Sequence, residues 1–217
     1  MKYEWKKQAK ELYLPKDKPE LVTVPNFKFF MIKGKGNPNS EEFSEAIGVL
    51  YSLSYAIKML PKKGITPEGY YDFTVFPLEG IWDLDEEGRT LDILDKNRLI
   101  YTIMIRQPDF VTDKLAQEVI NSIKLKKPHP LLDQMRFDRL EEGLCLQMLH
   151  IGPYDDEPKS FSIMEDYCNQ NNLRRSSKVH REIYLSDVRK IQPEKLKTVL
   201  RFKVEDLNDE SCRVKKI

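Results

Sequence analysis

The chain has 217 residues, of which 40% are hydrophobic and 33% are charged, as in a globular protein with a well-solvated surface. Its 36 lysines and arginines nearly balance its 35 aspartates and glutamates, so the net charge of +1 gives no general reason to expect a nucleic-acid or membrane partner. Strongly apolar runs such as Leu99–Ile105 fall far short of the ~18 residues that span a bilayer.

The cysteines indicate a reducing compartment. Cys145, Cys168 and Cys212 are widely spaced, and no pair has the short spacing of a zinc or redox motif. The N-terminal residues are charged, carry Trp5 and contain no apolar signal region. We therefore expect a cytoplasmic protein.

The first half opens with a strand followed by a long helix. The apolar and aromatic run 21–33 predicts the strand, and Pro25 limits regular pairing to the later part of the run. Asn39 and Glu42 resemble a capping box with Asn39 as the N-cap. Apolar residues then recur at helical spacing, which predicts a helix over residues 40–60.

Four further strand signals and a second helix complete the first half. Residues 70–76 alternate with period two, and residues 81–84 and 89–94 flank a turn that is typical of a hairpin. The β-branched run 99–106 predicts a strand, and an apolar stripe after Thr112 predicts a helix.

The second half repeats this plan. Residues 143–150 predict a strand, 157–171 a helix, and 179–185 and 196–204 two more strands. Both halves therefore read strand, glycine-proline turn, helix, strand, strand, with a linker formed by residues 126–130 and the segment after them.

This order predicts the α+β class. Two strand–helix–strand–strand units can form a joint antiparallel sheet with helices on one side and a ligand groove on the other. We expect one compact domain with pseudo-two-fold symmetry. Its parts are a lead-in over residues 1–20, a first half with an extra helix over 21–127, and a second half over 128–217.

A row of polar side chains marks the strand at residues 179–185. Alternation places His180, Glu182 and Tyr184 on one face, whereas Arg181 and its apolar neighbours lie on the other, which suits packing against helices.

A carboxylate in the middle of an internal strand needs a compensating partner, because burying it alone raises its pKa and costs stability. Arg106 or Arg201 could neutralise Glu182. Alternatively, Glu182 lies in an open cavity that receives a cationic or hydrogen-bonding ligand. A third interpretation is an ordinary solvated sheet face.

Other candidate ligand-binding residues are aromatic or acidic. Trp82, three residues after Glu79, could stack on a flat or cationic ligand or simply fill the hairpin core. Tyr154 follows a glycine-proline turn where a helix begins, and its phenol could donate to a ligand or cap the edge of the core. Tyr101 is a further candidate ligand-binding residue.

Several chemistries are set aside. The pair His180 and Glu182 has the spacing of a zinc deaminase motif, but no Pro-Cys-x-x-Cys follows. The sequence contains no HExxH, phosphate-binding loop or Gly-x-Ser-x-Gly elbow. We expect neither a metal nor a nucleotide cofactor. With no helix-turn-helix extension or basic stripe, we expect no nucleic-acid partner.

Four segments, in order along the chain, resemble the GyrI-like proteins. The segments are GKGNPNSEEFSEAIGVLYSLSYAIK (Gly34–Lys58), PLEGIWDL (Pro77–Leu84), HIGPYDDEP (His150–Pro158) and HREIYLSDVRKIQPEKLKTVLRF (His180–Phe202). The match most resembles the stand-alone subgroup, which carries no DNA-binding domain.

The resemblance implies a duplicated fold with the ligand in a groove between the halves. The same fold serves as the effector-binding part of multidrug-responsive transcription regulators, in which a buried glutamate that corresponds to Glu182 meets cationic aromatic drugs. Some stand-alone members are hydrolases that open the cyclopropane of DNA-alkylating natural products. In such an enzyme Glu182 would be the acid/base or the water-orienting group, Tyr154 and Tyr184 would be phenol donors, and Trp82 would be a stacking platform. Arg181 departs from many relatives, which are less basic there.

Three functions follow as hypotheses. The first is a module that binds flat, possibly cationic drug-like small molecules, in defence against xenobiotics. The second is a hydrolase of cyclopropane-bearing genotoxins, and the third is a protein-interaction inhibitor of the DNA gyrase type.

Overall fold

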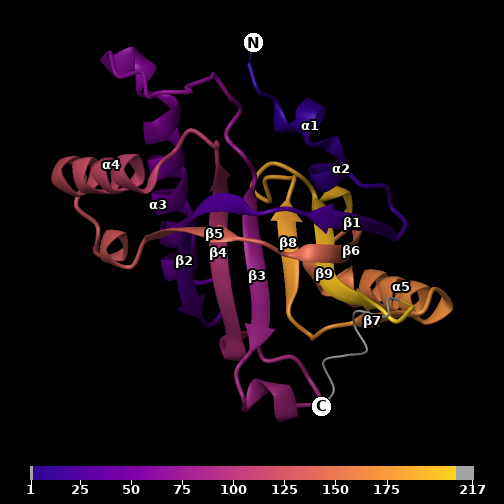
Figure 1. Cartoon of the computed structure of the whole chain (residues 1–217). Helices are drawn as coiled ribbons and strands as arrows, with labels where there is room; N and C mark the ends of the chain where they lie inside the picture. Colours follow the sequence, from indigo (N-terminus) through magenta and orange to yellow (C-terminus); the bar gives the residue numbers. More distant parts are fainter. Residues whose placement is uncertain (1, 209–217) are drawn as a thin grey trace, which may run out of the picture. The chain divides into compact units, whose positions relative to one another are not determined.

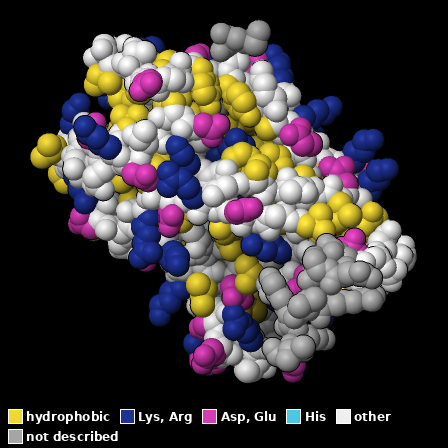
Figure 2. All heavy atoms as spheres, in the orientation of Figure 1, with side chains coloured by type: hydrophobic (Ala, Val, Ile, Leu, Met, Phe, Trp, Pro, Cys, Tyr) yellow, Lys and Arg dark blue, Asp and Glu magenta, His cyan; other side chains and the backbone are white. Residues whose placement is uncertain are grey.

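A computed structural model describes residues 2–208, and the chain folds as two compact units (Figure 1). Unit 1 consists of Met1–Gln8 and Asn26–Leu140, and unit 2 of Ala9–Pro25 and Glu141–Ile217. Cys212 lies outside the described residues. None of the helices within residues 2–208 combines the length and the apolar character needed to cross a membrane. Figure 2 shows basic and acidic side chains interspersed on the face in view, as the balanced composition implies.

Unit 1 contains an antiparallel sheet in the order β3, β4, β2, β5. Its strands are β2 (Phe27–Lys35), β3 (Leu78–Leu84), β4 (Leu99–Gln107) and β5 (Arg136–Leu140). Its α-helices are α1 (Trp5–Gln8), α3 (Glu41–Lys58) and α4 (Asp113–Lys126). The predicted strand at 99–106 and the helix after Thr112 are confirmed, and the Thr112 side chain caps α4 by accepting from the Leu115 N–H at 3.2 Å.

Helix α3 covers one face of this sheet and lies beside α4 (Figure 1). Its inward stripe of Leu50, Leu53 and Ile57 is fully buried, so the helical spacing found in the sequence reflects core packing. The N-cap is Ser40, whose hydroxyl accepts from the Phe43 N–H at 3.3 Å, so the prediction of Asn39 as N-cap is wrong by one residue.

Two predicted strands of unit 1 are absent from the described structure. Residues 70–76 form only an isolated bridge between Phe73 and Tyr3, because no neighbouring strand runs beside them. The second predicted strand, residues 89–94, begins within a 3₁₀ turn over Gly88–Thr90. In this turn the Asp85 carboxylate accepts from the Gly88 N–H at 2.7 Å. Ile93 beyond it is 83% exposed, which explains why this apolar run gains nothing from strand pairing.

Unit 2 contains an antiparallel sheet in the order β1, β6, β9, β8, and β7 pairs with the end of β9. Its strands are β1 (Glu20–Val24), β6 (Gly143–Ile151), β7 (Leu173–Arg175), β8 (His180–Tyr184) and β9 (Lys197–Asp206). Its α-helices are α2 (Lys10–Tyr13) and α5 (Glu157–Gln170). The predicted strand 21–33 is therefore two strands, β1 in unit 2 and β2 in unit 1, separated at Pro25 because proline cannot donate to a ladder.

Helix α5 packs on one face of the unit 2 sheet and lies beside β7 (Figure 1). The core on this face is formed by buried apolar side chains from the strands and the helix: Leu146, Met148, Met164, Cys168, Leu173, Leu200, Phe202 and Val204. Glu182 pairs in register with Leu200, and opposite residues of an antiparallel pair point to the same face. The Glu182 side chain therefore lies on the α5 face.

The opposite face of the unit 2 sheet carries buried arginines. Arg181 forms a 2.9 Å ion pair with Glu142, and Arg201 approaches the same carboxylate at 3.5 Å. Arg201 also donates to the Gln147 side chain and to the carbonyl oxygen of Leu12, which lies in α2. The Arg181 face was expected to suit packing against helices, but α5 packs on the other face, where its apolar partners are Leu200 and Phe202.

The two units share one plan, which confirms the predicted α+β class with duplicated units. In unit 1 the order is β2, α3, β3, β4, and in unit 2 it is β6, α5, β8, β9, with the short β7 inserted.

Candidate functional site

The site begins at Glu182, in the middle of β8. Its side chain is largely buried, with 9% of the residue exposed. Tyr184 donates its hydroxyl to Oε2 of Glu182 at 2.7 Å, and Nε2 of His180 lies 3.2 Å from Oε1. These three side chains occupy alternate positions of one strand, so they share a face as the sequence predicts.

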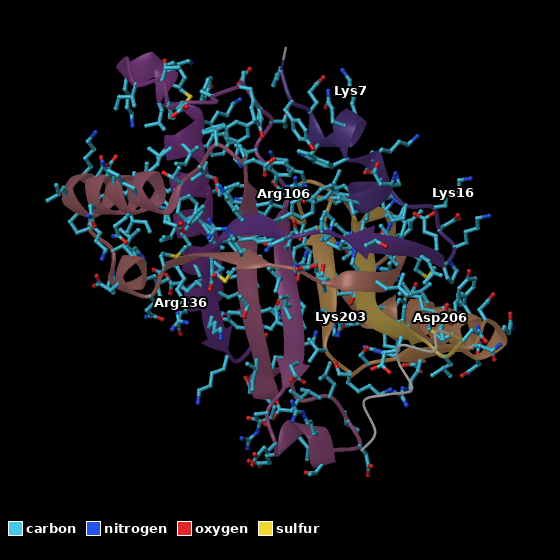
Figure 3. The ribbon with its side chains drawn as sticks, viewed as in Figure 1. Lys7, Lys16, Arg106, Arg136, Lys203 and Asp206 are labelled. Carbon is cyan, nitrogen blue, oxygen red and sulfur yellow. The ribbon has the colours of Figure 1, made fainter. Side chains whose placement is uncertain are left out.

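Neither predicted arginine partner neutralises this carboxylate. Arg201 lies on the opposite face of its sheet and pairs with Glu142. Arg106, which is labelled in Figure 3, belongs to unit 1. Its guanidinium stacks on the rings of Phe27 and Phe76, at 3.3 and 4.7 Å from their centroids. Within residues 2–208, the basic side chain that contacts Glu182 is His180, and no lysine or arginine forms an ion pair with this carboxylate.

Tyr154 comes to this carboxylate from the turn before α5. Gly152 has φ of +140°, a backbone conformation that favours glycine, and it lets the chain leave β6 sharply. The Tyr154 ring then meets Tyr184 edge-to-face, with centroids 5.9 Å apart. Burial of its hydroxyl and the nearby Glu182 charge raise the pKa of Tyr154.

A second carboxyl group, Glu157, belongs to the site and was missed by the sequence analysis. It is the first residue of α5, is 6% exposed, and lies within hydrogen-bonding reach of Glu182. Its Oε1 has no hydrogen-bond partner among the described residues. Burial and the neighbouring Glu182 charge raise the pKa of Glu157 well above its ordinary value. The signal in the sequence was a third acidic residue, after Asp155 and Asp156, at the start of a helix.

The turn that carries Tyr154 and Glu157 is held by a buried histidine. Nδ1 of His150 lies 2.9 Å from the Ser160 hydroxyl, and Nε2 lies 3.1 Å from the Pro153 carbonyl oxygen. His150 thus links the end of β6 to the first turn of α5.

We call Glu157, Glu182, His180, Tyr154 and Tyr184 the acidic cluster. The structure brings together in it four of the seven predicted site residues, together with the additional Glu157. It places two buried carboxyl groups beside two phenols, and burial and the Glu182 charge raise the pKa of Glu157.

The other three predicted residues lie in unit 1. Trp82 and Tyr101 face each other across β3 and β4, with centroids 5.4 Å apart, and both pack on Phe43 of α3. Both are buried, as expected of core aromatics. Glu79 is three residues before Trp82 on β3 and therefore points to the opposite face, so it does not join them. Their contact with a ligand stays a prediction.

Two surface hollows are lined by residues other than the acidic cluster and the predicted site residues of unit 1. One, of about 220 Å³, lies between α3 and the end of α4 and is lined in part by Glu45 and His129. The other, of about 350 Å³, lies beside α5 and β7 and is lined in part by Glu165 and Arg175, which form a 2.9 Å ion pair.

The duplicated α+β fold with its acidic cluster places the chain in the class of small-molecule-binding domains. The model of the GyrI-like small molecule binding domain matches residues 17–205. The chain therefore belongs to the GyrI-like family.

Solved structures agree with this membership. A hydrolase from Listeria innocua is 38% identical, with 94% of this chain and 100% of that chain covered and a TM-score of 0.87. An uncharacterized conserved protein from Listeria innocua is 40% identical over the same shares, with a TM-score of 0.86. The C-terminal domain of EcmrR is 11% identical over 87% of this chain and 98% of that domain, with a TM-score of 0.54, and shares the fold alone. No curated protein sequence matches the chain significantly.

Proposed function

We propose that the protein binds flat, cationic small molecules at the acidic cluster, where Glu182 supplies the opposite charge. Family membership supports a small-molecule ligand, and the acidic cluster supports its charge. Sequestration of such compounds would suit defence against foreign toxic molecules.

The observation that carries this proposal is the surrounding of Glu182. A buried carboxylate is normally neutralised by lysine or arginine, because desolvation of an isolated charge is costly. Here the contacts of Glu182 are a phenol, an imidazole and a second carboxyl group. No lysine or arginine of residues 2–208 forms an ion pair with Glu182, and a cationic ligand would supply this positive charge. The ring of Tyr154 could stack on an aromatic cation.

Fluorescence titration with ethidium, a flat aromatic monocation, tests the proposal. Glu182→Gln should weaken ethidium binding by about tenfold or more, since it removes one attractive charge from a largely buried site. Glu118→Gln makes the same charge change on the exposed face of α4 and should leave the affinity unaltered. Equal affinities for the wild type and Glu182→Gln would remove Glu182 from the binding account.

A second candidate function is hydrolysis of strained electrophiles. It is favoured by the Listeria structure named a hydrolase and by the phenols beside Glu182. In a cyclopropane conjugated to a carbonyl group, Glu182 would accept a proton from water as the water oxygen bonds to a ring carbon. The carbon–carbon bond would break, its electron pair would move to the carbonyl oxygen, and Tyr154 would donate a proton there.

Mass spectrometry separates catalysis from binding. The wild-type protein incubated with a cyclopropane-bearing alkylator should yield the alkylator plus one water, and Glu182→Gln should yield none. Tyr154→Phe should slow this turnover while keeping the affinity for the intact alkylator. Formation of the water adduct at equal rates with and without protein would exclude the hydrolase function.

A further inference from the structure

Two carboxyl groups of unit 2 meet in the acidic cluster. Glu157 comes from the first turn of α5 and Glu182 from β8, and they are 6% and 9% exposed. Their side chains lie within hydrogen-bonding reach of each other. Two carboxylates in such contact repel each other strongly when both are ionised, so the negative charge of one favours a proton on the other.

The neighbouring elements bring little positive charge to this pair. On β8 the titratable neighbours are His180 and Tyr184, and on the turn before α5 they are Tyr154 and the acidic Asp155. On β6, His150 is engaged by Ser160 and the Pro153 carbonyl oxygen. Over the described part of the chain, neither carboxyl group forms an ion pair with lysine or arginine, so a proton held between them would relieve their repulsion.

A ligand that carries positive charge changes this balance according to its charge. A monocation neutralises the single negative charge of the protonated pair and leaves the proton in place. A dication offers a second positive charge, which favours the fully ionised pair and expels the proton into solvent.

We propose that the Glu157–Glu182 pair releases its shared proton when a doubly charged aromatic cation binds, so that the site prefers dications to monocations. This inference rests on the proposed function, because it assumes that cations bind at the acidic cluster. It assigns to Glu157 a role in ligand selection.

Propidium and ethidium are suitable probes, because they share one phenanthridinium ring system and differ in charge, +2 and +1. Isothermal titration calorimetry at pH 7 in phosphate and in Tris, which differ in ionisation enthalpy, measures the number of protons released on binding. The wild type should release about one proton with propidium and almost none with ethidium. Propidium should also bind about tenfold more tightly at pH 8 than at pH 7, while ethidium binding changes little.

The matched variants locate the proton. Glu157→Gln should release no proton with propidium and should lose about tenfold of the preference for propidium over ethidium. Glu118→Gln should retain both the release and the preference. Proton release that survives in Glu157→Gln would place the proton on another group, such as His180, and overturn the inference.

The failure of this inference differs from the failure of the proposed function. If the wild type binds both dyes with equal proton release, only the role of Glu157 is wrong. If it binds neither dye, cation binding at the acidic cluster is wrong and the inference is overturned with it.

Discussion

Tyr184 donates its hydroxyl to the Glu182 carboxylate at 2.7 Å, from a position two residues further along the same strand. The two side chains share a face, so the bond needs no contribution from a distant segment. It satisfies one oxygen of a buried carboxylate that no lysine or arginine of residues 2–208 neutralises. The Tyr184 hydrogen bond thus stabilises the buried Glu182 carboxylate where no ion pair with lysine or arginine does so within residues 2–208.

Removing this donor should cost stability. Tyr184→Phe leaves Oε2 of Glu182 without its hydrogen bond, and we expect the free energy of unfolding to fall by about 1–2 kcal/mol in urea denaturation. Tyr154→Phe is the matched control, because the Tyr154 hydroxyl makes no hydrogen bond with another residue of the range 2–208, and it should change stability by less than about 0.5 kcal/mol. Equal losses in the two variants would contradict the importance of the Tyr184 bond.

Glu157 should make stability depend on pH. Its pKa is raised in the folded protein from an ordinary value of 4.5, so above about pH 4.5 the unfolded chain loses a proton that the folded protein keeps. Stability should therefore decline with rising pH, by at most about 1.4 kcal/mol per pH unit, until the folded carboxyl also ionises. Denaturation of Glu157→Gln from pH 4 to 9 should show a flatter profile and higher stability than the wild type at alkaline pH. Parallel profiles would show that Glu157 ionises normally.

Glu142 should be a strong determinant of unit 2 stability. It lies between Arg181 and Arg201, both nearly fully buried, at 2.9 and 3.5 Å. Glu142→Ala leaves these charges less compensated and should destabilise the protein by about 3 kcal/mol. The exposed neighbour Glu141 is the control, and Glu141→Ala should remain within about 0.5 kcal/mol of the wild type.

Two glycines of unit 1 should respond oppositely to alanine. A Cβ on Gly34 would lie 2.5 Å from the ring of Tyr101, which is itself packed against Trp82 and Phe43 and cannot move freely. Gly34→Ala should cost about 1–3 kcal/mol. Gly48 lies within α3 with open space around it, so Gly48→Ala should raise stability by about 0.5–1 kcal/mol. Thermal unfolding of both variants measures the contrast.

The elements with strong periodicity were predictable. Helices α3 and α5 and strand β4 follow their sequence patterns because each buries one regular face. Residues 89–94 were misread, because an apolar run alone does not supply a neighbouring strand. Strand β5 was read as linker, since its short, charged sequence pairs with only one edge of β2.

The candidate site was predictable where its residues share a strand. His180, Glu182 and Tyr184 follow from alternation alone. The contact between Glu182 and Glu157 depends on how α5 packs on the unit 2 sheet, which no local pattern encodes. For the same reason the sequence could not tell which face of β8 meets the helix, nor that Arg201 belongs to Glu142.

The position of strand β1 in the chain affects how unit 2 folds during synthesis and how it can be truncated. This strand pairs with β6, yet it precedes the whole of Asn26–Leu140 along the chain. During synthesis the ribosome releases β1 more than a hundred residues before its partner, so unit 2 cannot be finished until nearly all of the chain has emerged. A truncated chain that begins at Glu141 would leave β6 with an open edge, free to recruit a strand from another molecule. Fusing residues 9–25 to such a fragment would restore the missing strand.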